Sequence, residues 1–420
     1  MRARWGWLVI GAVAACDRCG SESKGDAGSK ADVSTIADAN VETSVDANVE
    51  TRIDASVDAS VDANDAGDAG ASACRLIHGP TEQPFRGPAA MVVTPSELRL
   101  VANDAGKPRV FTVPIPPASV IVGEGPKPAS FVAMRWSPCE VAGKWAYCQA
   151  QGGSVYRTTL GTTDTKQIAK SAPSTRIAAA ALGSDHAVLA TLDARHTTEG
   201  VMLQAFATLD DGETVRLSED GAGATTIRLV SRGDKVVALY LDTRTAMVPV
   251  HARTLGLGAK GELARLDDAV VFVGGPPERG IDFAAAQSAK SLVLLLPSSQ
   301  ETTAFGMAAI PIADPPKDDT PAIWSSYPNG LDPAPIGASV DPRGAALPYV
   351  ARVRPREAAP GSPRVVELGR VDEAGAFSSL GPISAGKHVT DVAVAVDTHG
   401  AVWILYGDAS ATWLERRLCP

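Results

Sequence analysis

Aromatic side chains are scarce in this chain: Phe, Trp and Tyr make up 5% of its 420 residues, although 45% are hydrophobic. The apolar residues are mostly Ala, Val and Leu, and 39 Gly and 30 Pro interrupt them. Such frequent breaks suit many short strands joined by turns better than long helices. The composition therefore predicts an all-β fold.

Positive charge is also scarce. The net charge is −9, and residues 21–70, with twelve acidic and three basic side chains, account for nearly all of the excess, whereas residues 71–420 carry only −2. A near-neutral folded region offers no basic surface to a phosphate backbone. We expect no nucleic-acid partner.

Motifs for catalysis, metals or cofactors are missing. The six histidines are isolated, and no two have the spacing of metal ligands. Residues 256–261 match a dinucleotide-binding pattern, but a short alternating run follows where a helix is required, so a hairpin turn is predicted. Residues 232–234, Arg-Gly-Asp, are likewise predicted to form a turn. Residues 183–186 contain Ser, Asp and His, but neighbours in one turn do not generally align as a catalytic triad. We predict no catalytic residue, no cofactor and no metal.

The apolar run at the amino terminus, Trp5–Ala15, is too short to span a bilayer. Arg2 and Arg4 precede it, which is typical of a secretory signal peptide over residues 1–15. It ends in Val, Ala, Ala and then Cys16, an ending that resembles the lipobox of bacterial lipoproteins.

This resemblance implies cleavage before Cys16, a diacylglycerol on its thiol and a palmitate-type acyl chain on the new amine. Such chains imply a durable membrane-lipid anchor and a place in the bacterial cell envelope, facing the periplasm or the cell surface. Asp17 leaves the choice of membrane open. The alternative is an ordinary signal peptide with an unmodified Cys16.

Residues 16–73 consist largely of Asp, Ala, Val, Ser and Asn. Val or Ile recurs every four residues from Val41 to Val61, which leaves a weak amphipathic helix or a partner-binding repeat as alternatives. Because large apolar residues are missing and these residue types form helices poorly, a disordered acidic linker is predicted. A flexible coil of this length spans about 40 Å.

After Cys74 one pattern recurs: a turn, five to seven apolar residues, and a polar break. It is clearest at Lys235–Leu241, and the intervals are roughly 40 to 55 residues, which is typical of the blades of a β-propeller. We predict a β-propeller of seven blades over residues 74–420; six or eight blades, or two β-sandwiches, are the alternatives. No signature of a particular propeller family is present. The recurrences begin near Ser96, Lys144, His186, Lys235, Lys290, Ala345 and Gly400.

The cysteines and strand runs predict how the ring closes. Blade seven stops one strand short, and Cys74–His78 could supply that strand. A disulfide between Cys74 and Cys419 would then join the two ends, and Cys139 and Cys148 could close a hairpin. Cys74 could instead pair with Cys19 or stay free; otherwise Cys19 is left unpaired. The strands predicted for blade two are 130–135, 144–149, 153–158 and 165–169, and those for blade seven are 388–395, 401–406 and 411–417.

The function predicted from this organisation is a non-enzymatic module that binds protein or glycan, or serves as a scaffold. Trp324 and Tyr327 lie in a Pro-rich insertion of blade five and could contact a ligand or pack over the blade edge. We expect elaborated loops and any ligand face in blades five and six. The alternative is a glycan-active hydrolase or lyase that uses carboxylates of the central channel, such as Asp282 and Asp391.

Overall fold

The computed structural model describes part of the chain, and all of the strands listed below lie in one unit, Ala63–Pro420. Every regular element of this part is a strand, and none of it forms a helix with the length and hydropathy that a membrane crossing requires. The described residues are 73–116, 131–133, 138–173, 175–219, 223–243, 248–274, 283–287, 292–298, 306–313, 315–318, 336–339, 347–355, 363–372, 376–383, 389–408 and 410–420.

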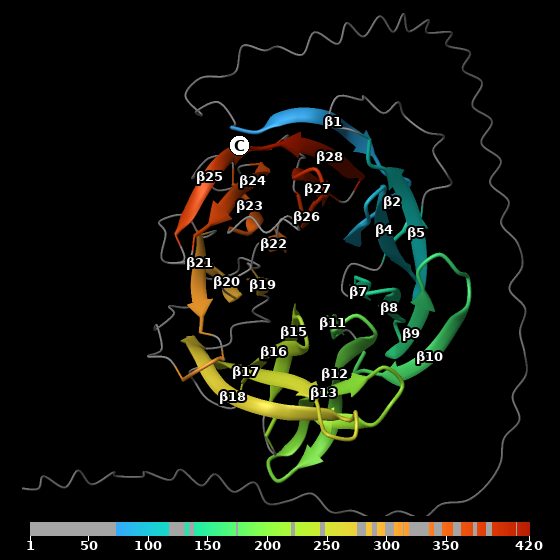
Figure 1. The fold of residues 1–420 in the computed structure, drawn as a ribbon, viewed down its shortest axis with the longest axis vertical. Coiled ribbons are helices and arrows are strands. Elements are labelled where there is room, and N and C mark those ends of the chain that lie inside the picture. Colours follow the sequence, from blue (N-terminus) through green and yellow to red (C-terminus); the bar gives the residue numbers. More distant parts are fainter. Residues whose placement is uncertain are drawn as a thin grey trace, which may run out of the picture. The chain divides into compact units, whose positions relative to one another are not determined.

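Seven sheets of three or four strands stand around a common axis (Figure 1). The innermost strands, β3, β7, β11, β15, β19, β22 and β26, contact one another in sequence and close a circle. The predicted seven-bladed β-propeller is confirmed.

The blades contain the following strands. Blades one to three are β3 (Ala89–Val93), β4 (Glu97–Asp104) and β5 (Lys107–Pro114); β7 (Glu140–Ala142), β8 (Trp145–Gln149), β9 (Ser154–Thr159) and β10 (Thr165–Lys170); and β11 (Ala178–Leu182), β12 (His186–Thr197), β13 (Gly200–Leu209) and β14 (Thr214–Arg216). Blades four and five are β15 (Ala224–Arg232), β16 (Lys235–Asp242), β17 (Val248–Leu257) and β18 (Leu263–Gly274); and β19 (Ala284–Gln287), β20 (Leu292–Ser298) and β21 (Gly306–Ile312). Blades six and seven are β22 (Ile336–Ser339), β23 (Tyr349–Pro355), β24 (Arg364–Val371) and β25 (Phe377–Pro382); and β26 (Asp391–Val396), β27 (Ala401–Gly407), β28 (Thr412–Leu418) and β1 (Arg75–Glu82).

Strand β16 shows how one blade fills two interfaces. The even-numbered residues Val236–Tyr240 belong to the apolar cluster shared with blade three, and the odd-numbered residues Val237–Leu241 belong to the cluster shared with blade five. A strand buried on both faces carries apolar side chains at every position, which explains the continuous apolar run that marks each blade. Within the described residues, each of the seven interfaces between blades holds one such cluster.

Two of the innermost strands consist largely of alanine. Alanines fill Ala178–Ala181 of β11 and Ala284–Ala286 of β19. The blades taper toward the axis, so neighbouring inner strands come close together and small residues fit best. At Gly337 of β22 a Cβ atom would lie 3.1 Å from the Cα of Ala393 in β26.

Blade two differs from the prediction at its inner strand. The expected strand 130–135 was wrong: the inner strand is β7, while β6 (Phe131–Val132) pairs in parallel with β2 (Phe85–Arg86). The ring centroids of Phe111 and Phe131 are 6.1 Å apart, so the apolar run near residue 131 packs against blade one. Packing of these aromatic rings stabilises the segment more than pairing in the blade-two sheet would.

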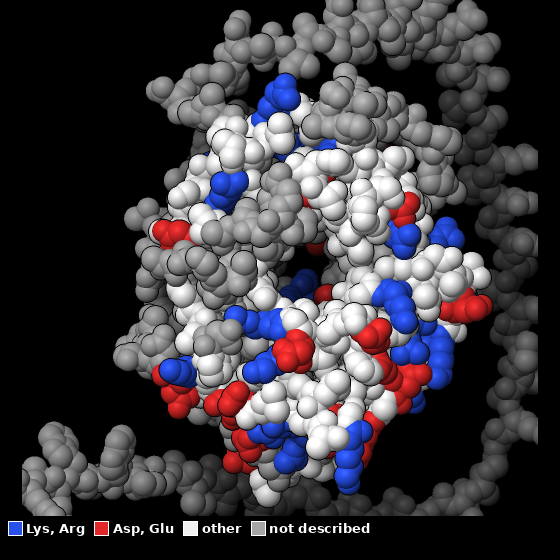
Figure 2. All heavy atoms as spheres, viewed as in Figure 1, with Lys and Arg blue, Asp and Glu red and all other residues white. Residues whose placement is uncertain are grey.

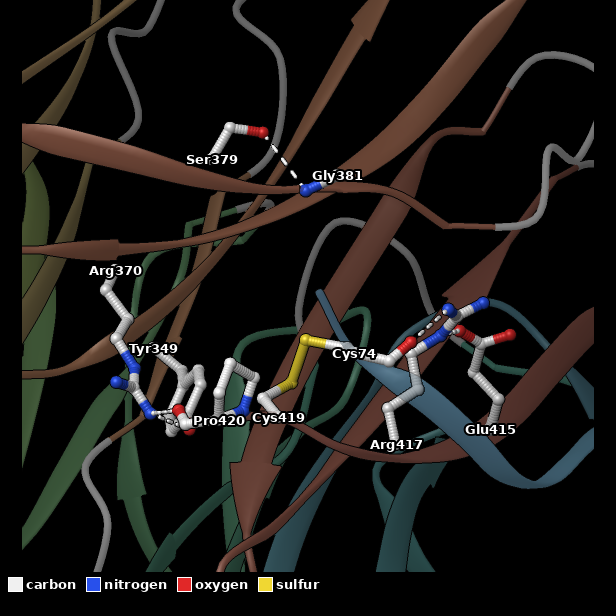
Figure 3. The surroundings of a disulfide bond; sticks show 9 residues. All are labelled: Cys74, Tyr349, Arg370, Ser379, Gly381, Glu415, Arg417, Cys419 and Pro420. Carbon is white, nitrogen blue, oxygen red and sulfur yellow. Dashed lines mark hydrogen bonds and ion pairs between the residues drawn. A yellow bond between two sulfur atoms is a disulfide. The ribbon is translucent and has the colours of Figure 1, made fainter. Parts of the chain in front are cut away.

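Blade seven closes the ring with strands from both ends of the folded unit. Strand β1 pairs antiparallel with β28, and the first pair is Arg75 opposite Leu418. Next to that pair the Cys74–Cys419 disulfide joins Cα atoms 4.2 Å apart (Figure 3). The predicted strand and the predicted disulfide are both confirmed. The Cys139–Cys148 disulfide is confirmed as well, with a Cα separation of 4.4 Å.

A buried ion pair supports the closure. Asp397, in the turn between β26 and β27, accepts hydrogen bonds at Oδ2 from Trp403 Nε1 at 3.0 Å and from Arg416 Nε at 2.8 Å. Arg416 donates from Nη1 to the carbonyl oxygen of Pro116, which follows blade one, at 2.9 Å. Because Asp397 and Arg416 are almost completely buried, each depends on the other for charge compensation.

Candidate functional site

The residues that begin the inner strands gather at one end of the ring. Each blade is an antiparallel sheet entered by its innermost strand, so all inner strands run in the same direction along the axis. Asp391 begins β26, Glu140 begins β7, and Arg176 lies two residues before β11. Three charged residues far apart in sequence are thereby brought to the same end.

A cavity of about 170 Å³, which we call the rim pocket, lies where the inner strands of blades seven, one and two begin. Figure 2 shows an opening at the centre of the ring, with side chains of both charge signs on its wall. At about 30 Å³ per molecule, the rim pocket has the volume of about six waters. Its lining residues are Gly87, Pro88, Ala89, Ala90, Pro138, Cys139, Glu140, Arg176, Asp391, Val392, Ala393, Leu405, Tyr406, Gly407 and Thr412.

Hydrogen bonds fix the wall between blades seven and one. Thr412 Oγ1 accepts a hydrogen bond from the backbone N–H of Gly87 at 2.9 Å and lies 3.2 Å from the carbonyl oxygen of the same residue. Thr390 Oγ1 donates to Asp391 Oδ2 at 3.0 Å, which helps to orient that carboxylate. Tyr406 is buried and packs against Trp413, with ring centroids 5.9 Å apart, and its ring forms part of the wall.

The Cys139–Cys148 disulfide holds the opposite wall. Strand β7 has only three residues paired with β8, and Glu140, opposite Tyr147, is the last pair before the disulfide. The crosslink takes the place of a further pair at this end of the hairpin. It therefore limits the movement of Glu140 at the pocket.

The rim pocket combines two carboxylates and one guanidinium with small apolar side chains. Carboxylates accept hydrogen bonds or compensate a positive charge, and a guanidinium donates to several acceptors at once. Among the described residues, no group of three His, Cys, Asp or Glu could hold a metal ion. The arrangement suits recognition of a small polar or charged group.

Of the site residues discussed in this paragraph, the structure describes only Asp391. Asp391 lies at the start of an inner strand, as expected, and lines the rim pocket. Cys16, Trp324, Tyr327 and Asp282 lie outside the described residues. The loops of blades five and six that we expected to be elaborated are also largely outside them.

Sequence reasoning missed Glu140 and Arg176. The inner strand of blade two was predicted ten residues too early, which placed Glu140 inside a hairpin instead of at the start of a strand. In both cases a charged residue stands immediately before a short apolar run, and this pattern could have identified Glu140 and Arg176 as residues at the entrance of an inner strand.

The Ser, Asp and His of residues 183–186 do not form a triad. Ser184 Oγ donates to Asp185 Oδ2 at 2.6 Å, whereas His186 Nδ1 lies 2.7 Å from Oδ2 of Asp210. Asp210 also accepts a hydrogen bond from the backbone N–H of Ala187 at 3.0 Å. The His–Asp pair therefore joins two turns of blade three.

The predicted turns are present but shorter than expected. Arg232 ends β15, so only Gly233 and Asp234 lie in the turn before β16. Of residues 256–261, the first two belong to β17, and 258–261 lie in the turn before β18.

Among the described residues, the titratable groups discussed next have shifted pKa values and lie between or within blades, and none of them lines the rim pocket. Burial raises the pKa of Tyr147 and that of Tyr240 to about 12. Burial, together with the charge of Arg416, lowers the pKa of His78. These residues support the scaffold.

Another group with a shifted pKa, Glu367, lies in blade six. Burial alone would raise the pKa of Glu367, but the hydrogen bond from Ser379 and the charges of Arg352 and Arg354 outweigh it and lower the pKa. Glu367 Oε2 lies 2.8 Å from Arg352 Nε and 3.1 Å from Arg354 Nε. The carboxylate is thus fully engaged in holding strands β23 and β24 together.

Comparisons with known proteins found only weak structural similarities. No family model matches the chain, and no curated protein matches it. The WD40 repeats of RRP9 align with a TM-score of 0.43 and 11% identity, over 83% of this chain and 99% of that chain. Aleuria aurantia lectin aligns with a TM-score of 0.36 and 9% identity, over 67% of this chain and 93% of that chain. A neuraminidase-like protein of a little yellow-shouldered bat isolate aligns with a TM-score of 0.38 and 8% identity, over 67% of this chain and 93% of that chain. Similarities this weak say nothing about activity.

Proposed function

We propose that the chain is an exported, lipid-anchored binding protein of the bacterial cell envelope, and that its propeller captures a protein or glycan ligand at the rim pocket. The observation that carries this proposal is the pocket itself. Three blades supply its charged groups, and hydrogen bonds and a disulfide hold its walls before any ligand arrives. Polar groups held in place in this way lose little entropy on binding.

Two disulfides support export. Disulfides form and persist in oxidising compartments outside the cytosol, and both pairs of this chain are formed. The lipobox-like ending at Cys16 then supports a lipid anchor, and the linker of residues 16–73 would hold the propeller clear of the lipid. Mass spectrometry of the mature amino terminus tests this step. We expect an acylated Cys16 as the first residue, and a Cys16→Ser variant that leaves the membrane fraction; an intact Met1 would contradict the anchor.

Cross-linking in envelope fractions tests binding at the rim pocket. We compare the unmodified chain with the double variant Glu140→Gln and Asp391→Asn. Glu213→Gln, an exposed carboxylate in the turn between β13 and β14, is the matched control. We expect the captured species to be lost with the double variant and kept with the control. Capture that survives the double variant would place binding elsewhere on the propeller.

The loop that contains Trp324 and Tyr327 is a second candidate contact. A Trp324→Ala variant should weaken capture of the same species if this loop also touches the ligand. Unchanged capture would remove the loop from consideration.

One observation favours an enzyme as the second candidate: Glu140 and Asp391 line the same cavity. Two carboxylates on opposite sides of a glycosidic bond can act as general acid and base. Chromogenic glycosides and envelope polysaccharides test this alternative, and Glu140→Gln should lower turnover by about 100-fold or more if it is right. Absence of turnover on these substrates, together with ligand capture, would favour the binding protein.

A further inference from the structure

The hairpin formed by β12 and β13 continues beyond the rest of blade three. Strand β11 pairs with β12 only over residues 186–190, and β14 pairs with β13 only over residues 206–208. The ladder between β12 and β13 nevertheless runs on without a register shift to Thr197 opposite Gly200. In the described part of the chain, no other strand pairs with residues 193–204. These residues form a two-stranded ribbon, which a further strand would stabilise.

The hydrogen bonds of β13 show which of its main-chain groups point to the open edge of the ribbon. Ala205 donates its N–H to Ser218 Oγ at 3.1 Å and accepts at its carbonyl oxygen from the N–H of Leu217 at 2.8 Å, on the side away from β12. The direction of these groups alternates along a strand, so the N–H and C=O of Leu203 and Val201 also point away from β12. Within the described residues, these four groups take part in no hydrogen bond.

The open edge of β13 lacks the features that protect other edges from pairing. Residues 200–204 are Gly, Val, Met, Leu and Gln, and the Val201 side chain is 64% exposed. Charged residues and prolines on an edge strand discourage pairing with another chain. Outer strands of other blades carry them: Lys107, Pro108 and Arg109 in β5, Lys166 and Lys170 in β10, and Arg265, Asp267 and Asp268 in β18.

We propose that the open edge of β13 pairs with the same edge of a second copy of the chain, antiparallel and about a two-fold axis. The edge is complementary to itself. When Val201 lies opposite the partner's Leu203, Leu203 lies opposite the partner's Val201, and the two pairs exchange four main-chain hydrogen bonds. The same register brings apolar side chains together across the strands, which stabilises a sheet further.

The opposite edge of the ribbon is protected against such pairing. Leu192 donates its N–H to Ser171 Oγ at 3.2 Å, on the side away from β13. By the same alternation, the main-chain groups of Ala194 and His196 point to the open edge of β12. The register that joins these two residues to a second copy places Arg195 opposite the partner's Arg195, and like charges directly opposite each other destabilise a sheet. The edge of β13 is therefore favoured, and that of β12 supplies a control.

The experiment is analytical ultracentrifugation of the full chain over a range of protein concentrations. The chain carries Cys16→Ser and Cys19→Ser, so that neither acyl chains nor a disulfide between linkers can join two copies. We expect the average mass to rise with concentration toward that of two chains, because a contact between two short strands is small and dissociates on dilution.

Proline substitutions test which edge forms the contact. Val201→Pro removes two of the four hydrogen bonds between the copies, one from each, and no bond within the hairpin, because this N–H points away from β12. It should weaken the dimer about thirtyfold or more. Ala194→Pro removes an outward N–H of β12 and is the matched control, which should leave dimerisation unchanged.

Hydrogen exchange of single amides locates the contact. The amides of Val201 and Leu203 should become protected as the dimer forms, whereas those of Ala194 and His196 should not. A mass of one chain at every concentration would overturn the inference, and so would a dimer that forms without this protection or that survives Val201→Pro. Loss of the dimer with Ala194→Pro as well would show that the contact is not the edge of β13.

Two further results are informative. Protection of Val201 and Leu203 by an added envelope protein, with the chain itself monomeric, would overturn the second copy in favour of a strand from that protein. Val201→Lys, which puts a charge on the edge, repeats the test if Val201→Pro lowers the urea midpoint, and it too should abolish the dimer. Because the rim pocket takes part in none of these measurements, the inference can fail while the proposed function stands.

Discussion

Loss of the Cys74–Cys419 disulfide should cost far more stability than loss of the Cys139–Cys148 disulfide. The first joins residues 345 apart in sequence and the second joins residues 9 apart. In the chain-entropy model the closed loops restrict the unfolded chain by about 6 and about 2.6 kcal/mol respectively. The expected difference in the free energy of unfolding is therefore about 3 kcal/mol. Both values are upper estimates, because unfolded chains retain some structure.

The test compares two double variants, Cys74→Ala with Cys419→Ala and Cys139→Ala with Cys148→Ala. Alanine is used because a serine hydroxyl at the buried positions 139 and 148 would add a desolvation cost of its own. Urea unfolding, followed by tryptophan fluorescence at one pH without reductant, gives the midpoint and slope for each variant. Equal losses, or a larger loss for the hairpin pair, would show that covalent closure of the ring is not what stabilises the fold.

Three further predictions concern single positions. The unfolded chain protonates His78 more readily than the folded protein does, so stability should fall as the pH drops below 6.5, and His78→Gln should flatten that decline in urea midpoints measured from pH 7.5 to 5. Gly337→Ala should lower the free energy of unfolding by about 1–3 kcal/mol because its Cβ meets the backbone of β26, whereas Gly152→Ala, with no atom within 4 Å, should change it little. Asp397→Asn should destabilise by about 3–5 kcal/mol because Arg416 is left buried without its counter-charge; a loss below 1 kcal/mol in calorimetry would contradict that role.

The sequence by itself determined the architecture. The apolar runs recur because the second strand of every blade is buried on both faces. Such a strand needs an apolar residue at every position, so each repeat contains a continuous apolar run. The runs at Lys235–Leu241 and Gly400–Gly407 therefore predicted their strands closely. The cysteines at the two ends of the folded unit predicted its closure, since a ring requires its first and last strands to meet.

Only the tertiary structure decided where the rim pocket lies. Nothing near Glu140, Arg176 or Asp391 in the sequence shows that the three belong together, because their proximity comes from the circular order of the blades. Tertiary packing also determined which segment forms the inner strand of blade two, because Phe131 packs against Phe85 and Phe111 near blade one. Local pattern records which residues are buried, whereas the closing of the ring determines which distant residues become neighbours.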